Sequence, residues 1–237
     1  MNELTGKNVL VLGGSRGIGA AIVRRFSAAG ASVAFTYAGS RDTANSLSDE
    51  TGAQAIQANS ADRDALTATV ASRGALDVIV VNAGTLVLGD PLTLDADEID
   101  RMIDVNVRAP YHASVEAARR MNDNGRIIVI GSVNGDRMPF AGGAAYALTK
   151  SAVQGMVRGL ARDLGDRGIT VNSIQPGPTD SEMNPAEGPM ASTMHSFMAI
   201  KRHAKPAEIA ELTAYIAGPH GAMITGSMQT IDGGFGA

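Results

Sequence analysis

The fold of this chain is decided by the stretch Val9-Leu10-Val11-Leu12-Gly13-Gly14-Ser15-Arg16-Gly17-Ile18-Gly19. Its first four residues are continuously apolar, as in a strand that is buried on both faces of a parallel sheet. The glycines allow a sharp turn and a close approach to a ligand, and residues 20–29 have a helical pattern. A strand, a glycine-rich turn and a helix in this order predict a dinucleotide site with phosphates at the helix N-terminus.

The same alternation of strand and helix continues along the whole chain. Predicted strands are Asn8–Leu12, Ser32–Thr36, Ala55–Ala58, Val78–Val81, Arg126–Ile130, Thr170–Gln175 and Met228–Ile231. Predicted helices lie near 17–29, 41–51, 62–73, 95–121, 146–165 and 206–217. Regular alternation favours an α/β fold, a Rossmann-type doubly wound parallel sheet flanked by helices. Because no linker or repeat interrupts it, residues 1–237 are expected to form a single Rossmann domain that binds a dinucleotide.

Composition limits the class of protein. The chain has 237 residues, of which 44% are apolar and 19% charged, with a net charge of −4 and no cysteine. These values suit one globular α/β domain without disulfides, and they do not favour binding to a nucleic acid polymer or a membrane. The N-terminus lacks the pattern of a secretory signal, and no apolar run approaches the roughly 20 residues needed to span a bilayer. A cytoplasmic protein is expected.

One segment breaks the regular pattern. Residues at about 178–205 are irregular and contain Met183, Met190, Met194 and Met198. One interpretation is an irregular excursion whose methionines pack inward. The other is a mobile substrate lid, because unbranched, polarizable side chains adapt to apolar ligands. The lid is favoured, given its place directly after the sixth strand.

The end of the second strand indicates which cofactor binds. NAD sites place an acidic residue there to bind the ribose 2′-hydroxyl, whereas NADP sites do not. This chain has Tyr37-Ala38-Gly39-Ser40-Arg41 and no acid before Asp42. Arg16, within the glycine turn, offers a second guanidinium to a 2′-phosphate. NADP(H) is therefore the predicted cofactor, although either arginine alone would be an ordinary surface charge.

Tyr146 and Lys150 stand four residues apart, on one face of a predicted helix. A tyrosine has an ordinary pKa of about 10, and a nearby cation is expected to lower it towards neutrality. Ser132 follows the fifth strand, at the sheet edge where α/β proteins bind ligands, and its hydroxyl can stabilise an alkoxide. A Tyr/Lys pair alone is usually helix surface, so its value here comes from Ser132. Together they predict proton transfer at a carbonyl group.

These motifs together resemble the short-chain dehydrogenase/reductase family over essentially the whole chain. The matching segments are the glycine turn (Gly13, Gly17, Gly19), Asn82-Ala83-Gly84, Asn106, Ser132, Tyr146, Lys150, Pro176-Gly177, Thr179, Ser181, Ile224-Thr225-Gly226 and Ile231-Asp232-Gly233-Gly234. The resemblance implies a seven-stranded sheet of order 3-2-1-4-5-6-7. It also implies a homotetramer or a dimer, with helices near 95–121 and 146–165 buried between subunits.

The resemblance also assigns roles to residues. Asn106, Ser132, Tyr146 and Lys150 would be catalytic: Tyr146 donates the proton, Asn106 holds a water of the proton relay, and Lys150 also holds the nicotinamide ribose. The implied cofactor contacts are Gly13, Ser15, Arg16, Gly17, Ile18, Gly19, Tyr37, Ala38, Gly39, Ser40, Arg41, Asn59, Ser60, Asn82, Ala83, Gly84, Tyr146, Lys150, Pro176, Gly177, Thr179 and Ser181. Asn59 replaces the aspartate usual near adenine. The expected activity is an NADP-dependent oxidoreductase that acts on CH–OH or C=O groups of a small molecule.

Two alternatives stay open. Stretches 109–119, 131–139 and 198–203 resemble a cyclic-di-GMP-binding branch of the family. One alternative to the reductase is therefore a non-catalytic effector that binds cyclic-di-GMP on the same fold. The segment Arg158-Gly159-Leu160-Ala161-Arg162 has the arginine spacing of some cyclic-dinucleotide receptors, but a helical surface or a subunit contact is favoured for it. The other alternative is a 3-oxoacyl-carrier-protein reductase, for which Arg137, Lys201, Arg202 and Lys205 would face the acidic carrier. His195 and His203 are interpreted as polar lid residues, and no metal site is predicted.

Overall fold

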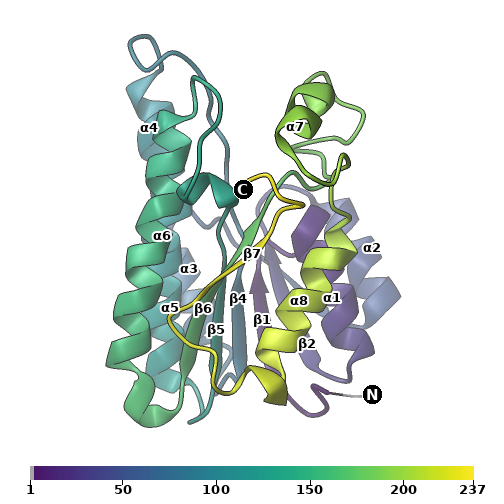
Figure 1. The fold of residues 1–237 in the computed structure, drawn as a ribbon. Coiled ribbons are helices and arrows are strands. Elements are labelled where there is room, and N and C mark those ends of the chain that lie inside the picture. Colours follow the sequence, from purple (N-terminus) through teal and green to yellow (C-terminus); the bar gives the residue numbers. More distant parts are fainter. Residues whose placement is uncertain (1–2) are drawn as a thin grey trace.

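The computed structural model describes residues 3–237, so Met1 and Asn2 of the predicted domain lie outside the described residues. Seven strands form one sheet in the order β3-β2-β1-β4-β5-β6-β7, and each neighbouring pair is parallel (Figure 1). The strands are β1 Asn8–Leu12, β2 Ser32–Tyr37, β3 Gln54–Gln57, β4 Val78–Val81, β5 Arg126–Ile130, β6 Thr170–Pro176 and β7 Met228–Ile231. The predicted fold class and strand order are confirmed.

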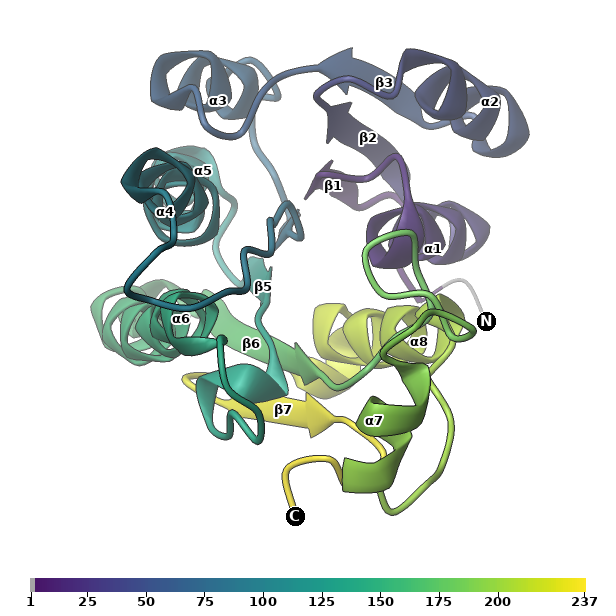
Figure 2. The same ribbon diagram turned by 90° about the horizontal axis from the view of Figure 1, so that it is seen from above.

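Helices cover both faces of the sheet (Figure 2). One face packs against α1 (Gly17–Ala28), α2 (Arg41–Thr51) and α8 (Pro206–Ala217). The other face packs against α3 (Arg63–Ala71), α5 (Ala109–Arg120) and α6 (Ala144–Asp163). Short 3₁₀ turns are η2 (Val133–Gly135), η3 (Gly165–Arg167) and η4 (Pro219–Gly221).

The continuous apolar run of β1 is explained by these two layers. Val9 and Val11 belong to the core cluster under α1 and α8, whereas Leu10 and Leu12 belong to the cluster under α5 and α6. Successive side chains of a strand point to opposite faces. Both faces of β1 are therefore buried, and each apolar residue contributes to one of two cores.

The predicted helix at 95–121 is a helical run in three parts. It consists of α4 (Ala96–Ile103), a π-helical turn η1 (Asp104–Arg108) and α5, which has Pro110 in its first turn. A proline within an α-helix lacks a donor and clashes with the preceding turn. The wider π turn lets the chain pass into Pro110 without interruption, and such turns are frequent at functional sites.

The irregular segment at about 178–205 contains α7 (Ala191–Phe197) and lies beyond the carboxyl ends of the strands (Figure 1). Its methionines divide into two groups. Met194 and Met198 are buried in a small cluster with Val133 and Phe235, while Met183 and Met190 are about half exposed. The segment thus combines inward packing with exposed apolar surface, and its movement as a lid stays a prediction.

Within residues 3–237, no helix is both long enough and apolar enough to cross a membrane. The cytoplasmic location expected from the sequence stays a prediction.

Candidate active site and cofactor cleft

The predicted site residues meet where the central parallel strands end. Gly13 follows β1, Asn82 follows β4, Ser132 lies just beyond β5, and Gly177 follows β6. These four strands include the point where the strand order reverses, between β1 and β4. In open α/β sheets, ligands bind beyond the carboxyl ends of the strands at such a point.

The glycine turn is closed by contacts that admit only glycine at two positions. Gly13 has a φ of +74°, and a Cβ placed on it would lie 2.8 Å from Ala83 Cα. A Cβ on Gly19 would lie 2.1 Å from the Gly13 carbonyl oxygen, to which the Asn82 amide donates at 2.7 Å. Gly13, Gly19 and Asn82-Ala83 therefore form one compact unit at the end of β1 and β4.

Thr36 completes this turn, although its sequence context did not predict a role for it. Its hydroxyl accepts a hydrogen bond from the Gly13 amide at 2.9 Å, and its carbonyl accepts one from the Gly14 amide, also at 2.9 Å. Thr36 is 1% exposed. The sequence signal that would have identified Thr36 is a hydroxyl side chain at the end of the predicted second strand, which lies beside the first strand and its glycine turn in the implied strand order.

The amino end of α1 suits an anionic group. Arg16 is its N-cap residue, and the Arg16 side chain makes no capping hydrogen bond. The first backbone amides of α1 are therefore not capped by that side chain. A Cβ on Gly17 would lie only 3.4 Å from Ser181 Cβ. The segment after β6 therefore lies beside the glycine turn, and a pyrophosphate between them would meet uncapped amides and the helix dipole.

Two arginines stand near the predicted 2′-phosphate end. Arg41 donates to the Gln57 side chain at 3.1 Å, and Gln57 donates to the Ala38 carbonyl at 3.2 Å. Arg16 forms an ion pair with Glu182 of the irregular segment. Both guanidinium groups are near the surface, so a ligand phosphate can replace these contacts at low cost.

Lys150 is a buried cation beneath Tyr146. Its residue is 7% exposed, its Nζ donates to the Ile130 carbonyl at 3.2 Å, and Nζ lies 5.6 Å from the centre of the Tyr146 ring. Burial lowers the pKa of Lys150 to about 8. A lysine buried in this way at the edge of a ligand site is prepared to bind a polar group of a ligand.

The pKa of Tyr146 moves in the opposite direction from the sequence-based expectation. Burial raises it, and a hydrogen bond with the Ser132 side chain lowers it by a smaller amount. The Lys150 ammonium is directed to the Ile130 carbonyl rather than paired with a phenolate. Desolvation of the charged form therefore dominates, and the phenol is held in its protonated form at neutral pH.

Ser132 is oriented by the turn that follows it. Its Oγ accepts a hydrogen bond from the Asn134 amide at 3.1 Å and donates to the Asn134 side-chain oxygen at 3.3 Å. Because Ser132 also bonds to Tyr146, its hydroxyl lies where it can share a ligand oxygen with the phenol.

Asn106 lies in the π turn η1 and connects two parts of the site. Its Oδ1 accepts from the Thr85 amide at 2.9 Å, and its Nδ2 donates to the Thr85 carbonyl at 2.8 Å and to Thr149 Oγ1 at 3.1 Å. A Cβ on Gly84 would lie 3.5 Å from Asn106 Oδ1 and 3.7 Å from Lys150 Nζ. The Asn106 side chain is thus used for positioning, and its water-holding role stays a prediction.

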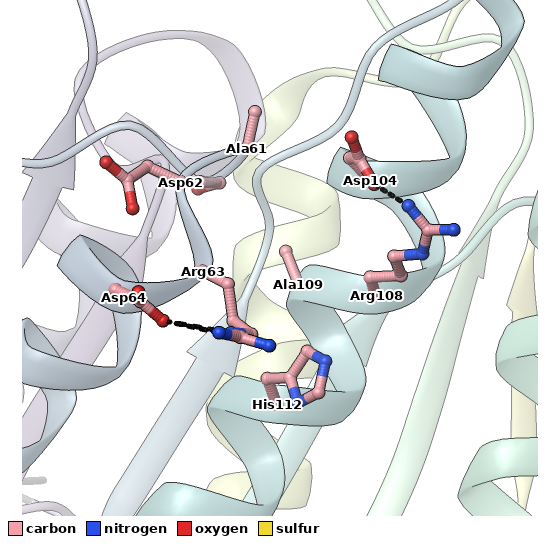
Figure 3. A pocket seen from close by; sticks show the side chains of 9 residues that line it. Ala61, Asp62, Arg63, Asp64, Asp104, Arg108, Ala109 and His112 are labelled. Atoms are coloured by element: carbon pink, nitrogen blue, oxygen red, sulfur yellow. Dashed lines mark hydrogen bonds and ion pairs between the residues drawn. The ribbon is translucent and has the colours of Figure 1, made fainter.

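Asn59 and Ser60, two of the predicted cofactor contacts, lie in the loop after β3. Asn59 uses its Oδ1 to accept from the Ala61 amide at 3.0 Å, so its side chain fixes the loop after β3. Ser60 lines a cavity of about 490 Å³ between α3 and α5 (Figure 3). In that cavity Arg63 pairs with Asp64 and Arg108 pairs with Asp104. Asp62, which also lines it, accepts a hydrogen bond from the Ala65 amide.

Several predicted surface residues do not assemble into a site. Arg158 and Arg162 are exposed on α6. Arg137 donates to the Phe235 carbonyl, and Arg202 pairs with Glu208, so only part of the basic surface considered for an acidic carrier is free. His195 and His203 contact each other through their ring nitrogens at 2.8 Å, in agreement with polar lid residues.

Comparisons with known proteins agree with this geometry. The family model described as Enoyl-(Acyl carrier protein) reductase matches residues 13–236. A curated relative from Escherichia coli (strain K12), the Cyclic-di-GMP-binding biofilm dispersal mediator protein, is 63% identical over 100% of both chains. Oxidoreductase UcpA of Salmonella typhimurium is 33% identical over 99% of this chain and 96% of its own.

A solved structure has the same fold and a bound nucleotide. The crystal structure of BdcA in complex with NADPH matches with a TM-score of 0.98 and 63% identity, covering 99% of this chain and 96% of that one. A short-chain dehydrogenase/reductase from Serratia marcescens matches with a TM-score of 0.97 and 52% identity over 99% and 100%. The chain belongs to the short-chain dehydrogenase/reductase family, as its motifs predicted.

Proposed function

We propose that the protein is an NADP(H)-dependent oxidoreductase that interconverts a carbonyl group and an alcohol. One observation carries the proposal: Tyr146, hydrogen-bonded to Ser132 and placed over buried Lys150, stands at the same sheet edge as the glycine turn. Such a placement joins a proton donor to a dinucleotide site. Relatives crystallised with NADPH and NADP support the choice of cofactor.

The residues that would hold the cofactor fit it along its length. The amino end of α1 and Ser181 would receive the pyrophosphate, Arg16 and Arg41 the 2′-phosphate, and Lys150 the nicotinamide ribose. When bound, NADPH supplies a hydride to the substrate. The absence of an acid from Tyr37 to Arg41, at the end of β2, favours NADPH over NADH, because no carboxylate of that strand end would repel the 2′-phosphate.

The residues around the substrate would handle the proton. Tyr146 gives its hydroxyl proton to the carbonyl oxygen while the carbonyl carbon gains the hydride, so one C–H and one O–H bond replace the C=O π bond. The raised pKa of Tyr146 keeps that proton available at neutral pH. Ser132 donates a second hydrogen bond to the same oxygen and stabilises its developing charge.

A substrate screen tests this proposal. Purified protein is mixed with NADPH or NADH and a panel of aldehydes, ketones, dicarbonyls and an acetoacetyl thioester, and the absorbance of reduced nicotinamide is followed. We expect turnover of at least one carbonyl compound with NADPH and much less with NADH. Turnover confined to the thioester would favour a carrier-protein reductase, a function that the relative MabA of Mycobacterium tuberculosis, 33% identical, bears in its name.

A second candidate function is the binding of cyclic-di-GMP. The observation that favours it is the 63% identity, over the full chain, to the Escherichia coli protein named for that ligand. A cyclic dinucleotide has purines, riboses and phosphodiesters, the same groups that an NADP site recognises. Calorimetric titration with cyclic-di-GMP, with and without saturating NADPH, tests it. Heat that disappears in the presence of NADPH would place both ligands in one cleft, and no heat in either case would exclude this candidate.

A homotetramer is part of the same proposal. A largely apolar groove of about 230 Å³ between α5 and α6 is lined by Val107, Tyr111, Val153 and Met156 among others. Tyr111 and the nearby helix residue Leu148 are 49% and 59% exposed. An apolar face of this kind supports contact with a second subunit, and sedimentation equilibrium would determine the number of subunits.

A further inference from the structure

The carboxylate of Asp136 lies where three elements of the active site meet. Gln154 Nε2 donates to Asp136 Oδ1 at 2.7 Å, and Gln175 Nε2 donates to Asp136 Oδ2. Gln154 Nε2 also donates to Gln175 Oε1 at 3.0 Å. The two amides and the carboxylate therefore form a closed network of three side chains.

Each member of the network belongs to an element that carries part of the proposed site. Asp136 ends the 3₁₀ turn η2 that begins directly after Ser132. Gln154 lies on α6 one turn after Lys150, and Gln175 lies on β6 directly before Pro176 and Gly177, two of the predicted cofactor contacts. The carboxylate thus connects the serine, the lysine helix and the cofactor strand.

Backbone packing beneath the network leaves little room for adjustment. A Cβ on Gly135 would lie 2.9 Å from Gln154 Nε2 and 3.0 Å from the Lys150 carbonyl oxygen. Ser151 Oγ donates to the Gly135 carbonyl at 2.7 Å. The turn η2 therefore rests directly on the helix at Lys150, so a shift of η2 would move Ser132 relative to Tyr146.

The two glutamines of the network are buried, whereas Asp136 itself is exposed. Gln154 is 8% exposed and Gln175 is 1% exposed. Buried amide groups need partners, and a donor left unpaired costs about 1–3 kcal/mol. A carboxylate accepts from both amides at once with charge-assisted bonds, which a neutral amide in its place cannot do.

We propose that Asp136 is a positioning residue for the active site: it holds η2 against α6 and β6 and so sets the place of the Ser132 hydroxyl. The proposal rests on the proposed oxidoreductase function. Asp136 acts through Ser132 and has no direct role with the substrate or the cofactor.

The test is the isosteric substitution Asp136→Asn, which replaces an acceptor by a donor that faces a glutamine donor. We expect kcat to fall at least about tenfold, because a small misplacement of a catalytic group is costly. The affinity for NADPH, measured by fluorescence titration, should change less than about threefold, since the loss is confined to positioning. Asp166→Asn, in the exposed turn η3 beyond the far end of α6, is the matched control and should behave as the natural protein.

A second substitution provides a rescue. Asp136→Asn combined with Gln175→Glu restores one carboxylate, which can accept from both neighbouring amides. We expect the double variant to recover most of the kcat lost by Asp136→Asn, whereas Gln175→Glu alone should lower kcat because two carboxylates would face each other. A merely structural loss would show no such recovery.

Hydrogen exchange measured by mass spectrometry gives a readout that needs no substrate. Amides of residues 132–136 should exchange faster in Asp136→Asn and return to the natural rate in the double variant. Unchanged exchange and kcat in Asp136→Asn, or a loss that the double variant fails to restore, would overturn the proposal. If the natural protein reduces no carbonyl compound, the proposed function fails, and the exchange rates alone decide the role of Asp136.

Discussion

Helix α6 carries two pairs of polar residues with the same spacing, and the two pairs differ in their surroundings. Tyr146 and Lys150 lie in its first half, where Lys150 is 7% exposed and bonds to the Ile130 carbonyl. Arg158 and Arg162 lie in its second half and are exposed. A spacing of four places two side chains on one face of any helix. The comparison shows that spacing alone is weak information about chemistry.

The difference comes from what each half of the helix meets. The first half lies beside η2 and the end of β5, at the carboxyl edge of the sheet where Ser132 is located. The second half runs towards η3 and the opposite edge of the sheet. Parallel strands bring ligand-binding groups to their carboxyl edge, so the first pair meets Ser132 and the Ile130 carbonyl there.

The largest effect on the first pair of α6 is expected from Tyr146→Phe. We expect turnover to fall by at least about a hundredfold, because proton transfer by a positioned group contributes that much or more. NADPH binding should persist, since the ring and Lys150 remain. The measurement is NADPH oxidation on the best compound of the screen, and Tyr215→Phe, which alters a half-exposed tyrosine on α8, is the control. Equal turnover by both variants would contradict the assigned role.

Lys150→Met tests the same pair through stability as well as activity. Turnover should be lost, while at pH 7 the free energy of unfolding should rise by about 1–3 kcal/mol, because a buried unpaired charge is removed. The pKa of Lys150 is about 8 in the folded protein and 10.5 in its ordinary state. The unfolded chain therefore binds more protons between these values, so the natural protein gains stability as pH rises from about 8 to 10.5.

The measurement is denaturant unfolding of the natural protein and of Lys150→Met from pH 7 to pH 10. Over this range the excess free energy of unfolding of Lys150→Met should decrease, because the natural protein gains stability as pH rises. An advantage that is constant with pH would show that Lys150 is not buried as an ammonium. The loss of the hydrogen bond to Ile130 reduces the expected gain but not its dependence on pH.

A smaller effect is expected at the ion pair between Arg16 and Glu182. Arg16→Ala should weaken NADPH binding about tenfold and leave NADH binding nearly unchanged, because one charge-assisted contact to the 2′-phosphate is lost. Glu182→Gln should strengthen NADPH binding by about two- to threefold, since it removes a competitor for the guanidinium. Fluorescence titration measures both, with Glu187→Gln, an acid of the same segment, as control. Equal losses for NADPH and NADH would argue against a 2′-phosphate contact.

The smallest effect is expected in the second half of α6. Arg158→Ala and Arg162→Ala should change turnover, NADPH affinity and cyclic-di-GMP binding by less than about twofold, and stability by less than about 0.5 kcal/mol, as for most exposed positions. Calorimetry with the double substitution would test this. A loss of cyclic-di-GMP binding would turn this exposed pair into a ligand site and remove the contrast between the two halves of the helix.

Local patterns predicted each strand to within one residue and each expected helix to within about two residues at either end, but α7 was not among the expected helices. The runs of β1, β4 and β5 are rich in β-branched apolar residues and buried on both faces, as is typical of the central strands of a parallel sheet. The helix expected at 95–121 required a π turn before Pro110, which the helical pattern does not reveal. The role of Thr36 in the glycine turn could not be predicted from its local pattern, because its hydroxyl bonds to Gly13, which lies 23 residues earlier in the chain.

The order of elements, the place of the glycine turn, and the positions of Ser132, Tyr146 and Lys150 could all be predicted from the sequence. These depend on periodicity and on short motifs, which are local properties of the chain. The direction of the Tyr146 pKa shift and the hydrogen bonds of Asp136 with Gln154 and Gln175 depend on how the chain folds. Burial and side-chain contacts between distant segments set those features, and no local pattern encodes how much water a folded site excludes.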